Sequence, residues 1–436
     1  MEINKPILQV ALDFVDLKRA ITLAGEALSG GCDWIEAGTP LIKSEGLNSI
    51  RELRRNFPQA VIVADMKIMD VGRTEVEIAA KAGANIVCVL GCAHIETIKE
   101  CVEAGKNYGA KIMIDLLEVK NPTELIKTAE KIGVDYIGVH IPIDEQMTGK
   151  ISFEMVSRIA KITKLPIAIA GGINSSNAAD AVKAGASIII AGGSITKSTN
   201  AKKAASEIKR AITNRIKIKS QEFNRVKTHD VLDALNKVSV ANISDAMHRG
   251  LPVNGLKPLF TPVKFSGKAI TVRTCPGDWA KPVQAIDLAN PGDVIVIDAA
   301  GAGPAVWGEL ATTSAMQKKI AGVIVYGAIR DVADIRKLKF PAFASVITPQ
   351  AGEPKGLGEI NVPITISGIK IMPGDWIMAD DDGVMVIPRD TVVETANRAM
   401  DILERENRLR VEIKRGSTLS KVTNLLKWEK KSGCEA

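Results

Sequence analysis

Short apolar segments recur at a regular interval through the first half of the chain. Eight are evident, starting about 25 residues apart, with amphipathic stretches such as Leu17–Leu28 and Thr74–Ala82 between them. The segments are Leu8–Asp13, Trp34–Gly38, Val61–Lys67, Ile86–Leu90, Lys111–Leu117, Tyr136–His140, Ile167–Gly172 and Ile188–Gly193. Apolar strands that alternate with helices indicate a parallel sheet covered on both faces. Eight such units predict a closed (β/α)8 barrel, or TIM barrel, over residues 1–212, whereas an open doubly wound sheet is the competing fold.

The pattern changes after Ile212. Residues 213–227 are polar and rich in Lys and Arg, which predicts a linker. From about residue 228, β-branched strands are separated by glycine- and proline-rich turns, as in Lys268–Arg273, Asp293–Asp298 and Gly322–Tyr326. These features predict a second α/β domain over residues 228–436. It ends in a highly charged helix from Asp390 to about Lys414, which we expect to be solvated or to contact another subunit.

Composition narrows the class of protein. Hydrophobic residues make up 46% and charged residues 25%, which describes a globular protein with ample core. The net charge of +7, with 4% aromatic residues and no block of Lys and Arg, favours anionic small molecules over nucleic acid as ligands. No apolar run is long enough to cross a membrane, and the N-terminus lacks a signal-peptide pattern. We therefore expect a cytoplasmic protein whose six cysteines, which form no CxxC pair, remain thiols.

Polar or flexible residues stand at the carboxyl end of each predicted barrel strand. They are Asp13, Glu36, Asp65 with Lys67, Gly91, Asp115, His140, the pair Gly171-Gly172 and the pair Gly192-Gly193. In (β/α)8 barrels this face holds the active site, because the loops after all eight strands converge there. A ring of such residues at successive strands therefore predicts an active site at the barrel mouth, with Asp13 among the groups that bind substrate.

The two glycine pairs follow the seventh and eighth strands. This is the usual phosphate position in barrels, where backbone N–H groups and a short helix receive an anion. One Gly-Gly marks a turn more often than a ligand site. Two pairs in these places, Gly171-Gly172 and Gly192-Gly193, favour phosphate binding.

The third predicted strand carries the densest charge. Asp65 and Lys67 alternate along it and should both face the barrel mouth, with Asp70 just beyond. Glu36 and Asp65, on adjacent strands, suit a Mg²⁺ ion that keeps several waters. Lys67 lies between two acids and should be charged, which favours an electrostatic or proton-delivering role over a Schiff base. A structural ion-pair ladder is the alternative. His140 is a candidate general acid or base.

These motifs together resemble a known family. Leu8–Asp13, Glu36–Pro40, the Asp-x-Lys-x-x-Asp pattern of residues 65–70 and the glycine pairs are similar to the orotidine-5'-phosphate decarboxylase suprafamily, and within it to the 3-hexulose-6-phosphate synthases. The resemblance implies a Mg²⁺-dependent aldol reaction that joins formaldehyde to D-ribulose 5-phosphate, or the reverse cleavage.

The same resemblance implies roles for individual residues. Glu36 and Asp65 would hold the metal, and Lys67 and Asp70 would contact the substrate. His140 would move the proton at the reacting carbon. Asp70 would reach across a dimer interface into the partner's site.

A sibling family, the 3-keto-L-gulonate-6-phosphate decarboxylases, offers an alternative activity. Its members usually carry an arginine three residues after the histidine that ends the sixth strand, where this chain has Ile143. No charged donor replaces it, which disfavours decarboxylation. The synthases, in turn, usually have glycine in place of Pro142.

The second domain holds one informative stretch. A strand over Asp293–Asp298 leads into a glycine-rich turn, and Arg330-Asp331 follows a later strand. Such a turn exposes N–H groups to a carboxylate or phosphate, and an Arg-Asp pair can bind a carboxylate and the water on a metal. A helix cap and a surface charge are the plain alternative.

Several motifs in this domain resemble the RraA-like family, which includes 4-hydroxy-4-methyl-2-oxoglutarate aldolases and regulators of ribonuclease E activity. They are Trp307-Gly308-Glu309, Gly327 with Arg330-Asp331, Pro341 to Ala344 and Asp382-Gly383-Val384. The resemblance implies a compact sandwich assembled as a trimer or hexamer. Arg330 would bind a substrate carboxylate and Asp331 would hold Mg²⁺ or Mn²⁺ through waters. A binding or oligomerising module without catalysis is the other hypothesis.

Overall fold

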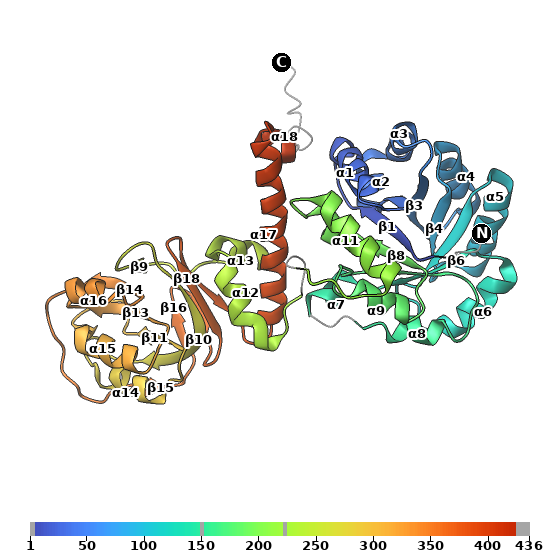
Figure 1. The fold of residues 1–436 in the computed structure, drawn as a ribbon. Coiled ribbons are helices and arrows are strands. Elements are labelled where there is room, and N and C mark those ends of the chain that lie inside the picture. The colour runs from blue at the N-terminus through green and yellow to red at the C-terminus, as the bar shows by residue number, and fades with distance from the viewer. Residues whose placement is uncertain (1–4, 149–151, 221–224, 424–436) are drawn as a thin grey trace, which may run out of the picture. The chain divides into compact units, whose positions relative to one another are not determined.

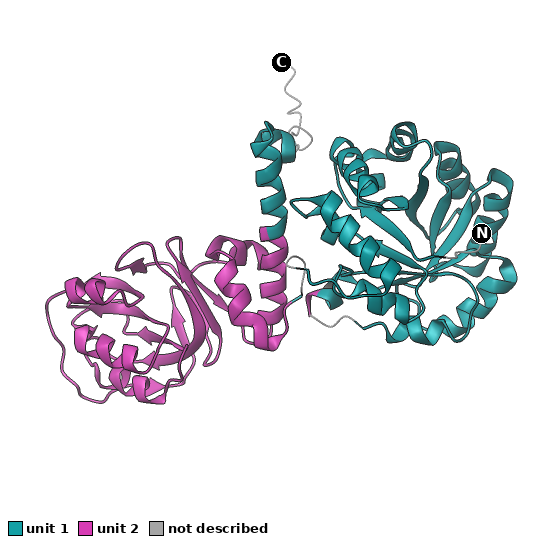
Figure 2. Cartoon of the chain, viewed as in Figure 1, with its two compact units in different colours: residues 1–146, 150–225, 404–436 teal, residues 147–149, 226–403 magenta. Residues whose placement is uncertain are grey.

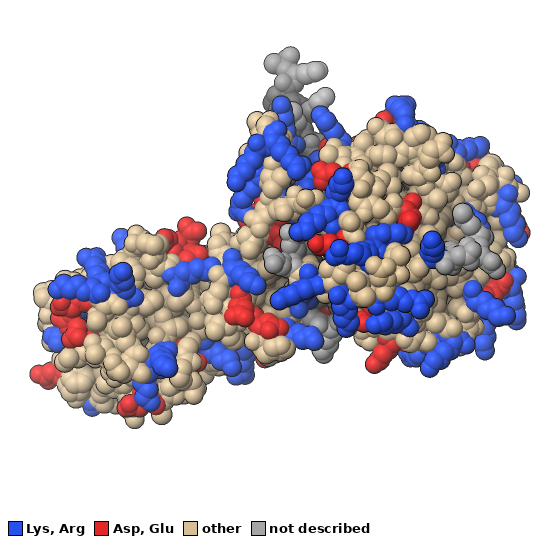
Figure 3. Space-filling model, viewed as in Figure 1, with Lys and Arg blue, Asp and Glu red and all other residues tan. Residues whose placement is uncertain are grey.

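The computed structural model describes residues 5–148, 152–220 and 225–423 (Figure 1). Packing divides the chain into two compact units (Figure 2). The barrel unit consists of Met1–Gln146, Lys150–Arg225 and Glu404–Ala436, and the second unit of Met147–Gly149 and Val226–Leu403. Lys and Arg side chains are scattered over the visible face of both units, with Asp and Glu between them (Figure 3).

Eight parallel strands close the barrel in sequential order, so that the last strand, β8, pairs with the first, β1. The strands are β1 (Ile7–Leu12), β2 (Trp34–Ala37), β3 (Val61–Ile68), β4 (Ile86–Leu90), β5 (Lys111–Asp115), β6 (Tyr136–His140), β7 (Ile167–Ala170) and β8 (Ile188–Ala191). The helices are α1 (Leu17–Ser29), α2 (Thr39–Glu45), α3 (Asn48–Asn56), α4 (Gly72–Ala82), α5 (Ile95–Tyr108), α6 (Pro122–Ile132), α7 (Ile143–Met147), α8 (Glu154–Ile159), α9 (Ala178–Lys183), α10 (Gly193–Thr196) and α11 (Ala201–Asn214). The predicted TIM barrel is confirmed.

Two apolar layers explain why these strands read as continuous hydrophobic runs. One large cluster joins the outward faces of the strands to the helices, with Leu8, Ile35 and Ile189 among its fully buried members. A smaller cluster, which includes Trp34 and Val63, fills the inside of the barrel. Successive side chains of a strand point to opposite faces, so both faces of each strand are buried. Two residues after Trp34 and Val63, the same inward face carries Glu36 and Asp65.

The second unit is built on a mixed sheet of order β19-β18-β10-β11-β13-β14-β9, to which β12 and β15 add at β13 and β10. Its strands are β9 (Lys257–Pro258), β10 (Lys264–Arg273), β11 (Val294–Asp298), β12 (Ala305–Trp307), β13 (Gly322–Ile329), β14 (Ala342–Ile347), β15 (Glu359–Ile360), β18 (Trp376–Asp380) and β19 (Gly383–Ile387), beside a hairpin of β16 (Ile364–Ile366) and β17 (Ile369–Ile371). Its helices are η1 (Thr228–Asp230), α12 (Val231–Lys237), α13 (Val240–Ala246), α14 (Ala280–Leu288), α15 (Glu309–Gln317) and α16 (Val332–Leu338).

The central strands β10, β11, β13 and β14 run parallel and are covered on both faces. One apolar cluster packs helices against the sheet and includes Ile286, Ala315 and Ile335. A second cluster lies on strands and hairpin, with Phe265 and Phe343 among its members. The predicted α/β sandwich is confirmed, because parallel strands need helical crossovers that cover the sheet.

The charged helix at the end of the chain is α17 (Val392–Lys414), followed by α18 (Leu419–Thr423). The sequence predicts it as a solvated or subunit-contacting part of the second domain. The packing instead divides it, and residues from Glu404 onward belong to the barrel unit. Arg408 on this part is only 2% exposed. The helical pattern of charges does not reveal this burial, because a buried arginine and a solvated one look alike in sequence.

Two further expectations concern cysteines and membranes. The cysteines at positions 32, 88, 92, 101 and 275 are free thiols, and Cys434 lies outside the described residues. Burial raises the pKa of Cys32 to about 12, so this thiol stays protonated. Within the described residues, no helix combines the length and apolar character needed to cross a membrane.

Asp278 fastens two loops of the second unit to each other. Its carboxylate accepts hydrogen bonds from the backbone N–H groups of Ala280, Lys355 and Leu357, at 3.1, 3.1 and 2.7 Å. Burial alone would raise the pKa of Asp278, but these donors outweigh it and hold the pKa below its usual value.

We predict that Asp278→Asn lowers the free energy of unfolding of the second unit by about 2 kcal/mol at pH 7. Because the folded pKa is depressed, this stabilisation is present above the unfolded pKa near 3.9 and is lost as the pH falls through the folded value. The difference between variant and wild type should therefore shrink from pH 5 to pH 3. Urea unfolding followed by tryptophan fluorescence measures it. Asp287→Asn, at an exposed position, is the matched control, and an equal effect of both variants would contradict the prediction.

Candidate active site

A cavity of about 520 Å³ opens at the carboxyl ends of the barrel strands. Its walls include most of the residues that the sequence places at strand ends. They are Asp13, Glu36, Asp65, Lys67, Asp115, His140, Gly171, Gly172, Gly192 and Gly193. The closed order of the strands brings these side chains together from segments up to about 180 residues apart, as expected for the catalytic face of a barrel.

Lys67 lies at an irregular point of β3. The register between β3 and β4 shifts between Ala64 and Ile68, and Lys67 has a φ of +48°, in the left-handed region. Val71, just after the strand, has a φ of +52°. A β-branched residue in this region is a marked outlier, and such strain concentrates at functional sites. The bulge turns the Lys67 side chain toward the cavity.

The ammonium of Lys67 bridges two carboxylates. Its Nζ lies 3.1 Å from Asp65 Oδ2 and 3.1 Å from Asp115 Oδ2. Burial lowers the pKa of Lys67, but the two carboxylates outweigh it and raise the pKa above its usual value. The expected charged state is therefore supported, with one correction. The second acid beside Lys67 is Asp115 on β5, where the sequence led us to expect Asp70, which is exposed and does not line the cavity.

Asp70 is exposed and does not line the cavity. Its carboxylate accepts a hydrogen bond from the N–H of Val71 at 2.7 Å. The flanking apolar side chains of Met69 and Val71 are 53% and 56% exposed. A single barrel unit therefore does not bring Asp70 to the other predicted catalytic residues.

Asp115 also contacts His140, whose Nδ1 lies 3.4 Å from Asp115 Oδ2. Burial raises the pKa of the Asp115 carboxyl, but the hydrogen bond from His140 and the charge of Lys67 outweigh it and hold the pKa below its usual value. Sequence analysis places Asp115 at a strand end and assigns it no role. Its position on β5, two strands from β3, hides the contact with Lys67. His94 serves as the N-cap of α5 and accepts from the N–H of Glu96.

Glu36 and Asp13 are the two acids of this cavity whose carboxyl pKa values are raised. Burial, then the charges of Asp65 and Asp13, raise the pKa of Glu36 well above its usual value. Asp13 is exposed to the cavity, yet the surrounding atoms limit its hydration. This desolvation and the charge of Asp65 raise the pKa of Asp13. Asp13 packs against Gly38, where a Cβ would lie 2.2 Å from its Oδ1.

The oxygens near Glu36 suit a hard cation. Gln9 Nε2 donates to Glu36, while Gln9 Oε1 is buried and has no hydrogen-bond partner within the described residues. Mg²⁺ prefers oxygen ligands and usually takes only one or two carboxylates, with waters and substrate oxygens completing its shell. Across the described ranges, no cluster of three or more His, Cys, Asp or Glu side chains is arranged as a metal site. Glu36 and Asp65 line the cavity from adjacent strands and offer two carboxylates, a number that Mg²⁺ commonly takes from proteins.

The glycine pairs line the same cavity, after β7 and β8. Gly171 and Gly172 have φ values of +106° and +69°, and a Cβ on Gly171 would lie 2.5 Å from the carbonyl oxygen of Ile141. Only glycine suits this backbone. Gly192 and Gly193 lead into α10, where the Ser194 hydroxyl is buried and has no hydrogen-bond partner within the described residues.

Three cationic residues that sequence analysis did not single out also line this cavity: Lys197, Arg225 and Arg405. Lys197 follows α10, Arg225 ends the predicted linker and Arg405 lies on α17. No sequence motif marks Arg225 or Arg405 as part of the barrel site. Arg225 lies more than ten residues after the predicted end of the barrel at Ile212, and Arg405 lies nearly two hundred residues after it.

The second unit has a cavity of its own, of about 380 Å³. It is lined by Arg330 and Asp331, by Gly308 and by the side chains of Trp279 and Trp307. The cavity lies at the carboxyl end of β13, as is usual for ligand sites of open α/β sheets.

Asp331 is held in a strained position in this cavity. It has a φ of +57°, and its Oδ2 accepts from the N–H of Glu309 at 3.1 Å. Arg330 Nε lies 3.5 Å from the same oxygen. The structure thus brings the predicted pair beside Gly308 and the start of α15, whereas the predicted glycine-rich turn at 299–304 lies before β12 and is not among the residues that line the cavity.

The fold and the first cavity define a (β/α)8 barrel with a polar site at its mouth, and the relatives of this barrel place it among the lyases. Residues 6–208 match the Orotidine 5'-phosphate decarboxylase / HUMPS family, and residues 240–386 match the RraA-like family, described as Aldolase/RraA. The chain belongs to the first family through its barrel and carries an RraA-like domain after it.

Each of the following relatives matches only one of the two domains of the chain. The 3-hexulose-6-phosphate synthase of Bacillus subtilis is 39% identical over 206 residues, which are 47% of this chain and 98% of the relative. That of Methylomonas aminofaciens is 38% identical over 201 residues, or 46% of this chain and 96% of the relative. A solved structure of the RNA-processing inhibitor RraA from Thermus thermophilis is 30% identical and covers 34% of this chain and 91% of its own, with a TM-score of 0.32.

Proposed function

We propose that the barrel catalyses the Mg²⁺-dependent aldol addition of formaldehyde to D-ribulose 5-phosphate, or the reverse cleavage. The observation that carries the proposal is the division of one cavity into an acidic side, around Glu36 and Asp65, and a glycine-lined side with a buried unpartnered hydroxyl, Ser194. A phosphosugar has a matching division, with hydroxyl and carbonyl oxygens at one end and a phosphate at the other. Relatives that are named 3-hexulose-6-phosphate synthase, and that match this chain over nearly their whole length, support the same reaction.

The acidic side would hold the metal through Glu36 and Asp65. When bound there, Mg²⁺ supplies polarisation of the substrate carbonyl and stabilises negative charge on its oxygen. Thr39 Oγ1 donates to Asp65 Oδ2 at 2.7 Å and thereby fixes the orientation of this carboxylate. Asp13, opposite Gly38, is placed to accept hydrogen bonds from substrate hydroxyls.

Lys67 acts in its charged form. The carboxylates of Asp65 and Asp115 keep the ammonium protonated, so it does not supply the neutral amine that a Schiff base requires. It stabilises the developing oxyanion and can donate a proton to it.

His140 moves the proton at the reacting carbon. A carboxylate only accepts hydrogen bonds, so the contact with Asp115 places the proton of the neutral ring on Nδ1 and leaves Nε2 as the basic nitrogen. Asp115 thus orients both Lys67 and His140, and it acts through them rather than on substrate.

The decarboxylase alternative is less well supported. Ile143, at the position where the decarboxylases usually carry arginine, lines the cavity with an apolar side chain that is 50% exposed. It offers no donor to a substrate carboxylate.

We predict that the full-length protein consumes formaldehyde in the presence of ribulose 5-phosphate and Mg²⁺. EDTA should abolish the reaction and added Mg²⁺ should restore it. Asp65→Ala should lower kcat/KM at least about 100-fold, since it removes a proposed metal ligand and a partner of Lys67. Asp180→Ala, an acid outside the cavity, should change kcat/KM less than twofold. Formaldehyde loss is measured colorimetrically, and an unaffected Asp65→Ala variant would sink the proposal.

We also propose that the barrel acts as a dimer in which Asp70 enters the partner's site. Support comes from the exposed apolar side chains of Met69 and Val71, which flank an acid that does not reach its own cavity. Exposed apolar groups around a polar residue are typical of an interface.

Mixing two inactive variants tests this arrangement. If Asp70 acts in trans, refolding Asp65→Ala together with Asp70→Ala should restore about a quarter of the wild-type activity, because half of the dimers are mixed and each holds one intact site. If Asp70 acts in its own subunit, no site in the mixture is intact and activity stays at background. Each variant refolded alone is the control.

For the second unit we propose a metal-dependent lyase activity on a 2-oxo acid. Arg330 and Asp331 line one cavity at the start of α15, and the pairing of a guanidinium with a carboxylate there supports binding of a substrate carboxylate and of metal-bound water. Arg330 would bind the carboxylate, and Mg²⁺ or Mn²⁺ near Asp331 would stabilise an enolate.

We predict that the full-length protein releases pyruvate from oxaloacetate when Mn²⁺ or Mg²⁺ is present. Arg330→Ala should reduce kcat/KM by about 100-fold, as expected for loss of a bidentate carboxylate contact. Asp65→Ala should leave this activity intact, which separates it from the barrel. Arg389→Ala, outside the cavity, is the matched control. Background rates for wild type and Arg330→Ala alike would favour a binding or oligomerising module.

A further inference from the structure

The basic side of the barrel cavity is assembled from three separate segments. Lys197 follows α10 at the end of the barrel, Arg225 lies near the end of the predicted linker, and Arg405 lies on α17. The last two fall outside residues 6–208, the part of the chain that matches the barrel family. The cavity wall therefore includes charges that the barrel segment by itself does not contain.

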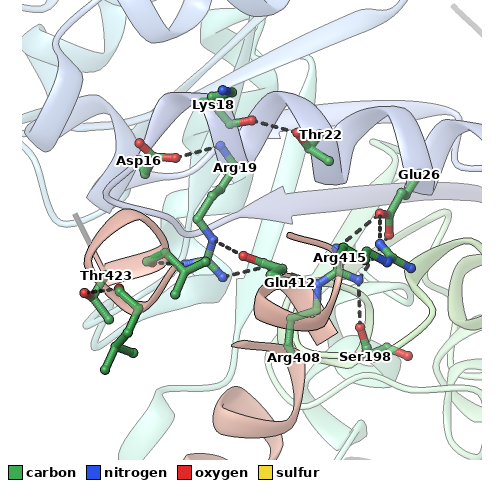
Figure 4. Close-up of polar contacts among 12 residues, drawn as sticks. Asp16, Lys18, Arg19, Thr22, Glu26, Ser198, Arg408, Glu412, Arg415 and Thr423 are labelled. Atoms are coloured by element: carbon green, nitrogen blue, oxygen red, sulfur yellow. Dashed lines mark hydrogen bonds and ion pairs between the residues drawn. The ribbon is translucent and has the colours of Figure 1, made fainter. Parts of the chain in front are cut away.

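The end of α17 is fixed to the barrel by a buried network centred on Arg408 (Figure 4). The Arg408 guanidinium donates to both carboxylate oxygens of Glu26 on α1, at 3.1 and 3.2 Å, and to Glu412 at 3.0 Å. Glu412 in turn pairs with Arg19 on α1 at 3.0 Å. Fully paired guanidinium groups at buried positions define one geometry, because a buried charge without its partners is costly.

One contact of this network places α17 beside the glycine pair after β8. Arg408 Nη1 donates to the carbonyl oxygen of Ser198 at 3.2 Å, two residues after α10. Arg405 precedes Arg408 by three residues and so lies on the same face of the helix. Arg405 lines the cavity together with Gly192, Gly193 and Lys197.

The linker reaches the other glycine pair. Ile218 and Ser175 exchange hydrogen bonds, from the Ile218 N–H to the Ser175 carbonyl at 3.0 Å and from the Ser175 hydroxyl to the Ile218 carbonyl at 3.0 Å. Ser175 follows Gly171-Gly172 in the loop after β7. Arg225, further along this segment, lines the cavity with Arg405.

The hydroxyl of Ser194, which lines this cavity, has no hydrogen-bond partner within the described residues. This hydroxyl is buried, and Ser194 is 8% exposed and lines the cavity between Gly193 and Lys197. A buried hydroxyl without a partner is unfavourable unless a ligand completes it. A hydroxyl, glycine N–H groups and several cations are the groups that recognise a phosphate.

We propose that the C-terminal helix takes part in substrate binding by the barrel, with Arg405 contacting the phosphate of the phosphosugar together with Arg225, Lys197 and Ser194. Arg408 is the positioning residue that holds Arg405 in place. This inference rests on the proposed function of the barrel and adds that its phosphate site is completed by residues that follow the barrel in the chain.

Kinetics of the full-length protein test the proposal. Arg405→Gln should raise the KM for ribulose 5-phosphate about 10-fold and leave kcat within twofold, because a charge-assisted contact to the distant phosphate is the same in the ground state and the transition state. The KM for formaldehyde should not change. The inhibition constant of inorganic phosphate should rise in parallel, and Arg405→Lys should recover part of the loss.

Arg410→Gln is the matched control, since Arg410 lies on the same helix, pairs with Glu406 and does not line the cavity. Arg408→Met should raise the same KM without lowering kcat, and combining it with Arg405→Gln should add little, because both changes remove one contact. A KM and a phosphate inhibition constant within twofold of wild type for Arg405→Gln would overturn the inference.

Calorimetric titration with ribulose 5-phosphate and with inorganic phosphate separates this outcome from failure of the proposed function. If the wild type binds both ligands but turns nothing over, the aldol assignment fails while the weaker binding of Arg405→Gln still supports the site. If the wild type turns over and Arg405→Gln binds as tightly as wild type, the aldol assignment stands and the role of α17 fails. Unphosphorylated ribulose should bind wild type and variant equally.

Discussion

The arrangement of carboxylates in the barrel cavity depends on the ammonium group of Lys67. Four carboxylates, from Asp13, Glu36, Asp65 and Asp115, face the same space, and their mutual repulsion with burial opposes ionisation of the innermost ones. The ammonium of Lys67 lies between Asp65 and Asp115 and offsets this repulsion. Placing it there requires a bulge in β3 and a left-handed backbone, and such strain persists only where surrounding structure over-determines it. A divalent cation bound beside Glu36 would offset the negative charge of the remaining carboxylates.

Charge is distributed unevenly around this cavity. Acids gather at the ends of β1, β2, β3 and β5, whereas glycine pairs and cations gather after β7 and β8 and on α17. A dipolar substrate is oriented by such an arrangement before any chemistry occurs, because each end has one favourable environment. In the proposed reaction, chemistry and phosphate recognition would thus use different segments of the chain. The buried Arg408 network fixes a segment from the end of the chain to the barrel, next to this cavity.

The second unit also has its candidate site at the carboxyl end of a parallel strand, here in an open sheet. Its cavity lies at the carboxyl end of β13, and Asp331 takes a left-handed backbone there, as Lys67 does in the barrel. Asp278 holds the neighbouring loop through three backbone donors, and Trp279 beside it forms part of the cavity wall. Each unit therefore has a cavity of its own at the carboxyl ends of parallel strands.

The sequence by itself determined the two folds, the eight strand ends and most of the acidic site. Alternation along buried parallel strands is a local property, and the residues that end them share one face whatever their distance in the chain. Local pattern also reveals the glycine pairs and Arg330-Asp331. Only the tertiary structure decided that Lys67 pairs with Asp115 rather than Asp70, because the partner on another strand is set by barrel closure and by a bulge. It alone placed Arg405 at the cavity, because Arg408, three residues later on the same helix, is buried against the barrel. The burial of an arginine on a charged helix follows from what packs against that helix and leaves no mark in its own sequence.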